Sequence, residues 1–419
     1  MYRLLTSTLS LLTIAAVTHA ENWPTWRGPR ENGVSNDKSL PVVWSATKNI
    51  RWKTALPEAG NSTPIVWGNR IFLTQALDKG KRRAVLCFDR ADGKKLWQRE
   101  LACTTKETTH ADNPHCSGSP VTDGQAVYAS FASAGIVAYD FDGKLLWHHK
   151  LEPLLHIFGN GSSPTLYKDL VIVFHGPGEP TYMIALDKRT GKQVWKQNEH
   201  ALNHQLFGTW SSPVLARFGQ RDELLMCLPG EKIGGDGWVK SYDPATGKEL
   251  WRCVGLGASL YASATVSPAT DAIVAASGFY GPVMAIRPGG NGDVTKSHRI
   301  WHEAGKNPQR IGTPVVADGY LYLAEAAGFA ECRDARTGKR LWKERLDGKL
   351  WGSMLLAAGR LYVSNLEGQT YVLAAGPKFQ RLATNDIGEP TYAALAASDG
   401  EIFLRTWKHL YCIKGNDQR

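Results

Sequence analysis

One short pattern recurs along the chain and constrains its fold more than any other feature. The pattern is a strand-like segment, a turn reading Asp-x-x-Thr-Gly-Lys or a close variant, and a second strand that ends in Trp. The Asp can accept hydrogen bonds from backbone N–H groups as the chain turns, and the Gly can take the positive φ that the return requires. Clear copies span 89–97, 140–147, 187–195, 243–251 and 334–342, and degraded copies end at Trp52 and Trp301.

A second signature follows each Trp after a loop. It begins with small residues, often Ser-Pro, and continues with alternating apolar residues, a turn and another strand. Each unit therefore reads as four short strands over about forty to fifty residues, which is the size of a propeller blade. The eight copies begin at 62–64, 118–120, 162–164, 211–213, 263–264, 312–314, 352–353 and 391–392.

The count predicts an all-β, eight-bladed β-propeller of four-stranded blades. The eighth unit, 389–414, lacks its own Trp-ending strand, whereas 49–53 supplies one with no strands before it. We expect this N-terminal strand to complete the last blade, because closure removes the free edges of the ring. The expected organisation is a signal peptide (1–20), an N-terminal extension (21–48), the propeller (49–415) and a tail (416–419).

The first twenty residues have the features of an export signal. Arg3 gives a positive start, residues 4–17 are apolar, and small residues precede a cleavage site after Ala20. The apolar stretch is too short to span a bilayer, and no later run approaches eighteen apolar residues. We therefore expect a periplasmic or secreted protein with no transmembrane segment in its mature form.

The formal net charge is +10, which favours anionic surfaces such as envelope glycans. The only dense basic run, 79–83, lies between two strand-like segments and is interpreted as a solvated hairpin tip. Nucleic acid is therefore not an expected partner, and a monomer is expected.

The Ala-Leu-Asp-x-x-Thr-Gly-Lys-x-x-Trp repeat resembles the pyrroloquinoline-quinone (PQQ)-like propeller family, and the stretch 23–35 (WPTWRGPRENGVS) also resembles members of it. The resemblance covers nearly the whole mature chain and implies the fold. It implies no single activity, because the family includes quinone-dependent dehydrogenases and propellers without a cofactor, among them the protein-binding outer-membrane assembly propeller.

The seven cysteines separate by their place in the repeat. Cys87, Cys332 and Cys412 share one slot in the third strand, where buried free thiols are expected. Cys103 and Cys116 bracket one loop, so a disulfide between them is a hypothesis for an exported protein. Two further cysteines, Cys227 and Cys253, are expected on non-adjacent strands of one blade.

Histidines concentrate in the connections between blades, which share one face with the mouth of the central channel. His200 and His302 are expected in such connections too. A concave mouth with aromatic and polar groups is a candidate ligand site, although long surface loops also collect polar residues without any such role. The candidate ligand-binding residues are His110, Asn113, His115, His156, Asn160, His204, Trp210, Tyr261, Arg310 and Trp351.

Standard catalytic and metal-binding motifs are absent from the sequence. The leading hypothesis is a non-enzymatic binding or scaffold propeller that recognises an envelope protein or an anionic glycan. A PQQ-dependent oxidoreductase with calcium is the alternative, although the adjacent Cys-Cys pair typical of quinone dehydrogenases is missing. A polysaccharide-acting enzyme is a third possibility and would need a second carboxylate opposite Glu325.

Overall fold

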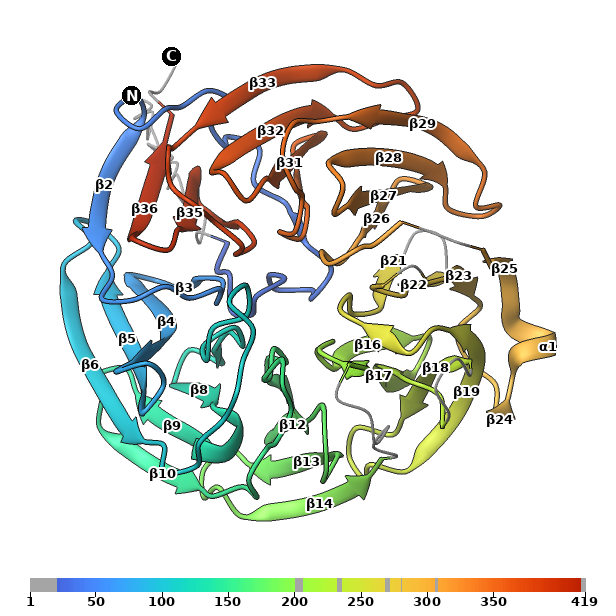
Figure 1. Ribbon diagram of the computed structural model, residues 1–419, viewed down its shortest axis with the longest axis horizontal. Coiled ribbons are helices and arrows are strands. Elements are labelled where there is room, and N and C mark those ends of the chain that lie inside the picture. Colours follow the sequence, from blue (N-terminus) through green and yellow to red (C-terminus); the bar gives the residue numbers. More distant parts are fainter. Residues whose placement is uncertain are drawn as a thin grey trace, which may run out of the picture.

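The computed structural model describes residues 21–199, 206–231, 236–267, 272–279, 281–305 and 308–415. Eight blades of mainly antiparallel strands surround a central axis, so the predicted all-β propeller is confirmed (Figure 1). Helix is confined to α1 (Thr295–His298) and the 3-10 turn η1 (Ala132–Ala134) in the described ranges. No helix among these residues is long and apolar enough to cross a membrane.

The first four blades follow one another along the chain, each from its inner to its outer strand. Blade 1 comprises β3 (Ile65–Trp67), β4 (Arg70–Leu77), β5 (Arg82–Asp89) and β6 (Lys95–Ala102). Blade 2 comprises β7 (Val121–Thr122), β8 (Ala126–Ser130), β9 (Ile136–Asp140) and β10 (Leu145–His149). Blade 3 comprises β11 (Thr165–Tyr167), β12 (Leu170–His175), β13 (Tyr182–Asp187) and β14 (Gln193–Asn198). Blade 4 comprises β16 (Val214–Phe218), β17 (Arg221–Leu228), β18 (Gly237–Tyr242) and β19 (Glu249–Leu256).

The remaining blades continue around the ring. Blade 5 comprises β21 (Thr265–Ser267), β22 (Ala272–Ala276), β23 (Val283–Ile286) and β25 (Arg299–Glu303). Blade 6 comprises β26 (Val315–Ala317), β27 (Tyr320–Glu325), β28 (Phe329–Asp334) and β29 (Arg340–Arg345). Blade 7 comprises β30 (Leu355–Ala357), β31 (Arg360–Ser364), β32 (Gln369–Ala374) and β33 (Arg381–Asp386). Blade 8 comprises β34 (Ala396–Ser398), β35 (Glu401–Arg405), β36 (His409–Lys414) and β2 (Ile50–Ala55).

Blade 8 is completed by the N-terminal strand, as predicted. Strand β2 pairs antiparallel with β36, with Trp52 opposite Cys412 and Ala55 opposite His409. In Figure 1 the blue strand β2 therefore lies outside the red strand β36. The two ends of the propeller are held together by backbone hydrogen bonds, which leaves no open edge at the junction.

The repeated Trp residues join neighbouring blades. The indole of Trp147, for example, donates a 2.7 Å hydrogen bond to the Lys188 carbonyl in the turn of the next blade. Gly191 of that turn has φ +67°, and a Cβ placed there would lie 2.6 Å from the Trp147 ring. The repeat glycine therefore serves both the turn and the close approach of the indole. Equivalent Trp-to-carbonyl bonds are made by Trp52, Trp97, Trp195, Trp301 and Trp342.

One blade junction departs from this rule. Trp251 donates instead to Glu223 of its own blade, at 2.8 Å. The chain between β23 and β25 folds outward there, and β24 (Gly292–Asp293) pairs parallel with β19 on its outer edge. This added strand and α1 project from the rim in Figure 1.

The N-terminal extension packs inside the ring of blades and forms backbone hydrogen bonds with it. It crosses the centre of the ring and bonds to the inner strands of several blades (Figure 1). Trp23 pairs with Val66 of blade 1, and the Pro24 carbonyl accepts the Thr122 N–H of blade 2. Further along, β1 (Val34–Ser35) pairs parallel with β30 of blade 7. We call residues 22–35 the plug, because they close one end of the channel.

Two charged side chains fix the plug from within. The Arg27 guanidinium is 2 % exposed and donates to the carbonyls of Met354 and Pro314 at 2.7 Å and to that of Asn32 at 2.9 Å. Glu31 contacts the Thr165 hydroxyl of blade 3 and accepts the Leu215 N–H of blade 4 at 2.8 Å. Loss of solvent around Arg27 lowers its pKa to about 9, so it stays charged near neutral pH.

Candidate functional site

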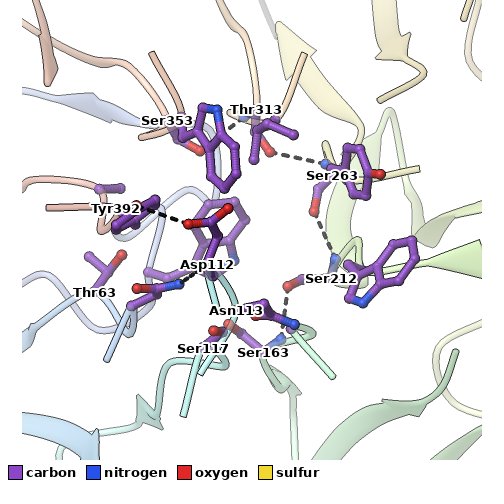
Figure 2. Close-up of a pocket in the computed structure, with 18 of the residues that line it drawn as sticks. Thr63, Asp112, Asn113, Ser117, Ser163, Ser212, Ser263, Thr313, Ser353 and Tyr392 are labelled. Carbon is purple, nitrogen blue, oxygen red and sulfur yellow. Dashed lines mark hydrogen bonds between the residues drawn. The ribbon is translucent and has the colours of Figure 1, made fainter. Parts of the chain in front are cut away.

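The Ser-Pro signatures form a ring of hydroxyl groups at the open end of the channel. In each of seven blades, a Ser or Thr lies two residues before the innermost strand, and Ala394 has the corresponding place in blade 8. The N–H of one member donates to the hydroxyl of the next over 2.8–3.0 Å, as Figure 2 shows for Ser163, Ser212 and Ser263. The hydroxyl ring comprises Thr63, Ser119, Ser163, Ser212, Ser263, Thr313 and Ser353.

Above this ring lies a cavity of about 360 Å³, which we call the central pocket. Its lining includes the hydroxyl ring and the Trp26 side chain of the plug. Its walls come from the loops between blades, so almost every blade contributes. The wall residues are Asn61, His110, Asp112, Asn113, Ser117, Phe158, Gly161, Trp210, Tyr261, Phe279, Gln309, Ile311, Trp351 and Tyr392.

Aromatic rings form two groups in the pocket wall. Trp210 packs against Tyr261 with ring centroids 5.1 Å apart and against Phe158 at 6.0 Å. Its indole N–H donates to the Gly159 carbonyl at 2.8 Å, which fixes the ring plane. The second group centres on Tyr392, which lies 5.3 Å from Trp351 and stacks on Trp407 at 4.8 Å. Such fixed rings suit ligands that present flat or cationic surfaces.

Asp112 brings a carboxylate into the middle of the pocket (Figure 2). Its loop connects blades 1 and 2, yet one carboxylate oxygen accepts the Tyr392 hydroxyl of blade 8 at 3.1 Å. The other oxygen lies 3.4 Å from His110 Nδ1. Asn61 donates to the Asp112 carbonyl at 2.8 Å and holds the loop from below. Burial and the Asp112 carboxylate raise the pKa of Tyr392 to about 12, so its hydroxyl remains a donor.

The structure brings five of the ten predicted binding residues into the pocket wall: His110, Asn113, Trp210, Tyr261 and Trp351. Four others lie outside the lining of the central pocket, and His204, like His200, falls outside the described residues. His156 is buried with its Nε2 3.2 Å from the Phe207 carbonyl, and Asn160 donates to the Gly176 carbonyl at 2.6 Å. Both support the loop that carries Phe158 instead of facing a ligand.

His115 and Arg310 face carboxylates outside the lining of the central pocket. His115 and Arg83 both contact Glu107. Burial would raise the pKa of Glu107, but the His115 hydrogen bond and the Arg83 charge hold it at about 2. Arg310 is 1 % exposed and donates to Glu331 at 2.9 Å. A sequence pattern does not reveal such partners, because only folding brings Arg83 of β5 and Glu331 of β28 against these loops.

Two sequence-based assignments are corrected. His302 belongs to the outer strand β25 and not to a connection; its Nε2 lies 2.8 Å from the Gly255 carbonyl. The predicted Cys103–Cys116 disulfide is not formed, and both thiols are free and buried. Their sulfur atoms face different partners: Cys103 approaches the Thr105 carbonyl at 3.5 Å, whereas Cys116 lies 3.9 Å from Arg405.

The other cysteine predictions hold. Cys87, Cys332 and Cys412 are buried free thiols in the third strands β5, β28 and β36, and burial raises their pKa values. Cys227 and Cys253 lie on β17 and β19, with β18 between them.

Sequence reasoning missed the pocket residues that depend on long-range folding. Trp26 belongs to the plug, and Asp112 and Tyr392 come from opposite ends of the propeller chain. Asp112 stands between two histidine-bearing positions of a long loop, which is the one local signal that could have singled it out.

The ring of eight blades and the repeat together define a PQQ-like repeat propeller. Family comparison is consistent with this: a model described as outer membrane protein assembly factor BamB matches residues 34–204, 81–344 and 235–402. The chain therefore belongs to this family of PQQ-like propellers.

Individual relatives fall into both branches of the family. BamB of Yersinia pestis is 23% identical over 335 residues, which cover 79% of this chain and 67% of that protein. The 1-butanol dehydrogenase (quinone) of Thauera butanivorans is 30% identical over 142 residues, 31% of this chain and only 21% of the dehydrogenase.

Solved structures show the same division. BamB from Moraxella catarrhalis superposes with a TM-score of 0.62 at 14% identity, covering 88% of this chain and 97% of that one. Quinohemoprotein alcohol dehydrogenase from Comamonas testosteroni superposes with a TM-score of 0.69 at 14% identity, covering 95% and 81%. At these identities the superpositions show the fold alone.

The described pocket does not fit PQQ, the cofactor of one branch. PQQ carries three carboxylates, and a site for it needs cationic side chains. The described lining contains no Lys or Arg and places the Asp112 carboxylate at its centre. Arg310, the one arginine among the candidate binding residues, is paired with Glu331. Within the described ranges no three His, Cys, Asp or Glu residues are grouped to hold a metal ion such as calcium.

Proposed function

We propose that this protein is exported to the cell envelope and acts there as a non-enzymatic binding propeller. Its central pocket receives a ligand, either free or presented by an envelope protein. The observation that carries the proposal is the pocket itself: two fixed aromatic groups, a hydroxyl ring and one carboxylate around a preformed cavity of about 360 Å³. Concave, mostly apolar cavities with a few convergent polar groups are the usual form of binding sites.

Catalysis of polysaccharide cleavage receives less support from the same residues. Hydrolysis of a glycosidic bond normally uses two carboxyl groups that face each other. Glu325 is 1 % exposed and contacts Lys343 at 2.7 Å, and it is absent from the pocket lining. Anionic glycans are also poorly matched to this pocket, although the basic surface of the chain could hold them elsewhere.

The proposal is tested by photo-crosslinking in cells that make the protein. A benzoylphenylalanine replaces Phe279 at the pocket, and in a matched control it replaces Leu382, which is 39% exposed on β33. We expect a discrete adduct from position 279 that the control lacks. A second assay supplies the purified protein with PQQ and calcium, several alcohols and a dye acceptor. Dye reduction at enzyme-like rates with no adduct would overturn the binding function.

A further inference from the structure

Asp112 places a negative charge in the central pocket, whereas the chain as a whole is positively charged. The chain has a net charge of +10, yet the described lining holds one carboxylate and neither Lys nor Arg. The Asp112 side chain is 32% exposed, so it is open to a ligand. A carboxylate accepts about four hydrogen bonds. The Tyr392 hydroxyl at 3.1 Å uses one of these positions and His110 Nδ1 lies 3.4 Å from the other oxygen, so positions remain for a ligand.

The arginines near the pocket are directed away from it. Arg405 is fully buried and donates to the Ser62 hydroxyl at 2.6 Å, the Thr74 carbonyl at 2.8 Å and Gln75 at 2.7 Å. Arg27 lies 5.6 Å from the centroid of the Trp26 ring, and its guanidinium donates to the carbonyls of Asn32 in the plug and of Pro314 and Met354 in the blades. The most favourable position for a ligand cation is therefore beside Asp112 and the aromatic rings of the pocket wall, away from the buried arginines.

The aromatic walls complete a site for a positive group. The faces of Trp, Tyr and Phe rings attract cations through their quadrupoles, most strongly where water is excluded. Trp210 and Trp351 belong to the two aromatic groups of the wall, and both groups border the cavity that holds Asp112. Six hydroxyls of the ring each accept one backbone N–H, which leaves their own O–H groups available to donate to a ligand oxygen.

We propose that the central pocket binds an organic cation, such as a quaternary ammonium or guanidinium group that also carries a hydrogen-bond acceptor. The inference rests on the proposed binding function and names the chemistry of its ligand. The cation could be a free solute or a side chain of a partner polypeptide; both share the recognition by Asp112 and the rings.

The test compares a cation with its neutral isostere. Purified protein is titrated at pH 8 with choline and with 3,3-dimethylbutan-1-ol, which replaces the charged nitrogen by carbon, and binding is followed by calorimetry and tryptophan fluorescence. Nα-acetyl-arginine methylamide represents a polypeptide side chain. We expect saturable binding of choline or of the arginine derivative, and little or none of the neutral alcohol. The cation that binds more tightly identifies the source.

Asp112→Asn removes the charge and keeps the shape, and it should weaken cation binding by roughly tenfold or more. Asp142→Asn, in the exposed β9–β10 turn, makes the same change of charge away from the pocket and should bind like wild type. Equal binding of the alcohol and the cations, unchanged binding by Asp112→Asn, or no cation binding would overturn the proposal. If one of these results is found and the crosslinked adduct from position 279 still forms, the proposed binding function is retained and only the cationic nature of the ligand is rejected.

Discussion

Two buried side chains have pKa values displaced in ways that make stability depend on pH. His175 is 1 % exposed and stacks on Tyr182, and neither ring nitrogen has a hydrogen-bond partner among the described residues. Burial lowers its pKa to about 4. Glu31 in the plug shows the opposite effect, because burial raises its pKa to about 7 despite hydrogen bonds from Thr165 and Leu215. Burial thus disfavours protonation of His175 and disfavours ionisation of Glu31.

For His175 the unfolded chain gains a proton near pH 6.5, whereas the folded protein does so only near pH 4. Stability is therefore lost as the pH falls from 6.5 towards 4, by roughly 2.5 kcal/mol at pH 4.5. His175→Phe keeps a ring against Tyr182 and should remove this part of the pH dependence. Urea unfolding of both proteins at pH 7 and pH 4.5 measures it. An equal loss of stability in both proteins would contradict the assignment.

For Glu31 the sign is reversed. The folded-state pKa near 7 lies above the unfolded value of 4.5, so stability is complete below pH 4.5 and is lost as the pH rises towards 7. Glu31→Gln can still accept the Leu215 N–H and cannot ionise. The variant should therefore gain stability relative to wild type between pH 5 and pH 8, measured by urea midpoints. A constant difference across this range would show that the carboxyl does not titrate there.

At the scale of the elements, the repeat was predictable because it is local. The turn glycines and the Trp-ending strands follow from residues close together in sequence. The closing strand β2 follows from counting these local units, because the last unit lacks the strand that 49–53 supplies. The pocket was only half predictable. Trp210, Tyr261 and Trp351 could be placed at the mouth by their position in the repeat. Arg310 instead pairs with Glu331 of β28, and His156 lies against the Phe207 carbonyl of another loop. Asp112 and Trp26 depend on how a long loop and the plug cross the channel.

The repeat glycine offers a clean test of blade-to-blade packing. Gly191→Ala should destabilise the protein both through its φ of +67° and through a Cβ 2.6 Å from the Trp147 ring. Gly219→Ala, in the β16–β17 turn with φ +61° and no atom within 4 Å of the added Cβ, carries the backbone cost alone. We expect about 1 kcal/mol for the control and about 2–3 kcal/mol for Gly191→Ala, from urea unfolding. Equal costs would mean that the indole moves aside freely.

At the scale of the whole molecule, the plug ties blades to one another across the axis. Arg27→Met would leave the buried carbonyls of Asn32, Pro314 and Met354 without their donor. A loss of about 2–4 kcal/mol is expected, whereas Arg30→Met, at an exposed position of the same segment, should change stability by less than about 0.5 kcal/mol. Similar effects of both substitutions would show that the plug contributes little to the ring.

The plug also sets an order of events when the protein is made. Residues 22–35 leave the ribosome before any blade, yet their partners extend from Val66 to Leu356. The plug is therefore synthesised first but can form all of its contacts only after blade 7 has been made. Strand β2 can pair only after β36, the last strand of the chain in the described ranges, has been made. The channel end stays open throughout this interval. A chain stopped before blade 7 would lack the Met354 carbonyl that Arg27 contacts and the strand β30 that pairs with β1. It would therefore expose these parts of the plug to other proteins.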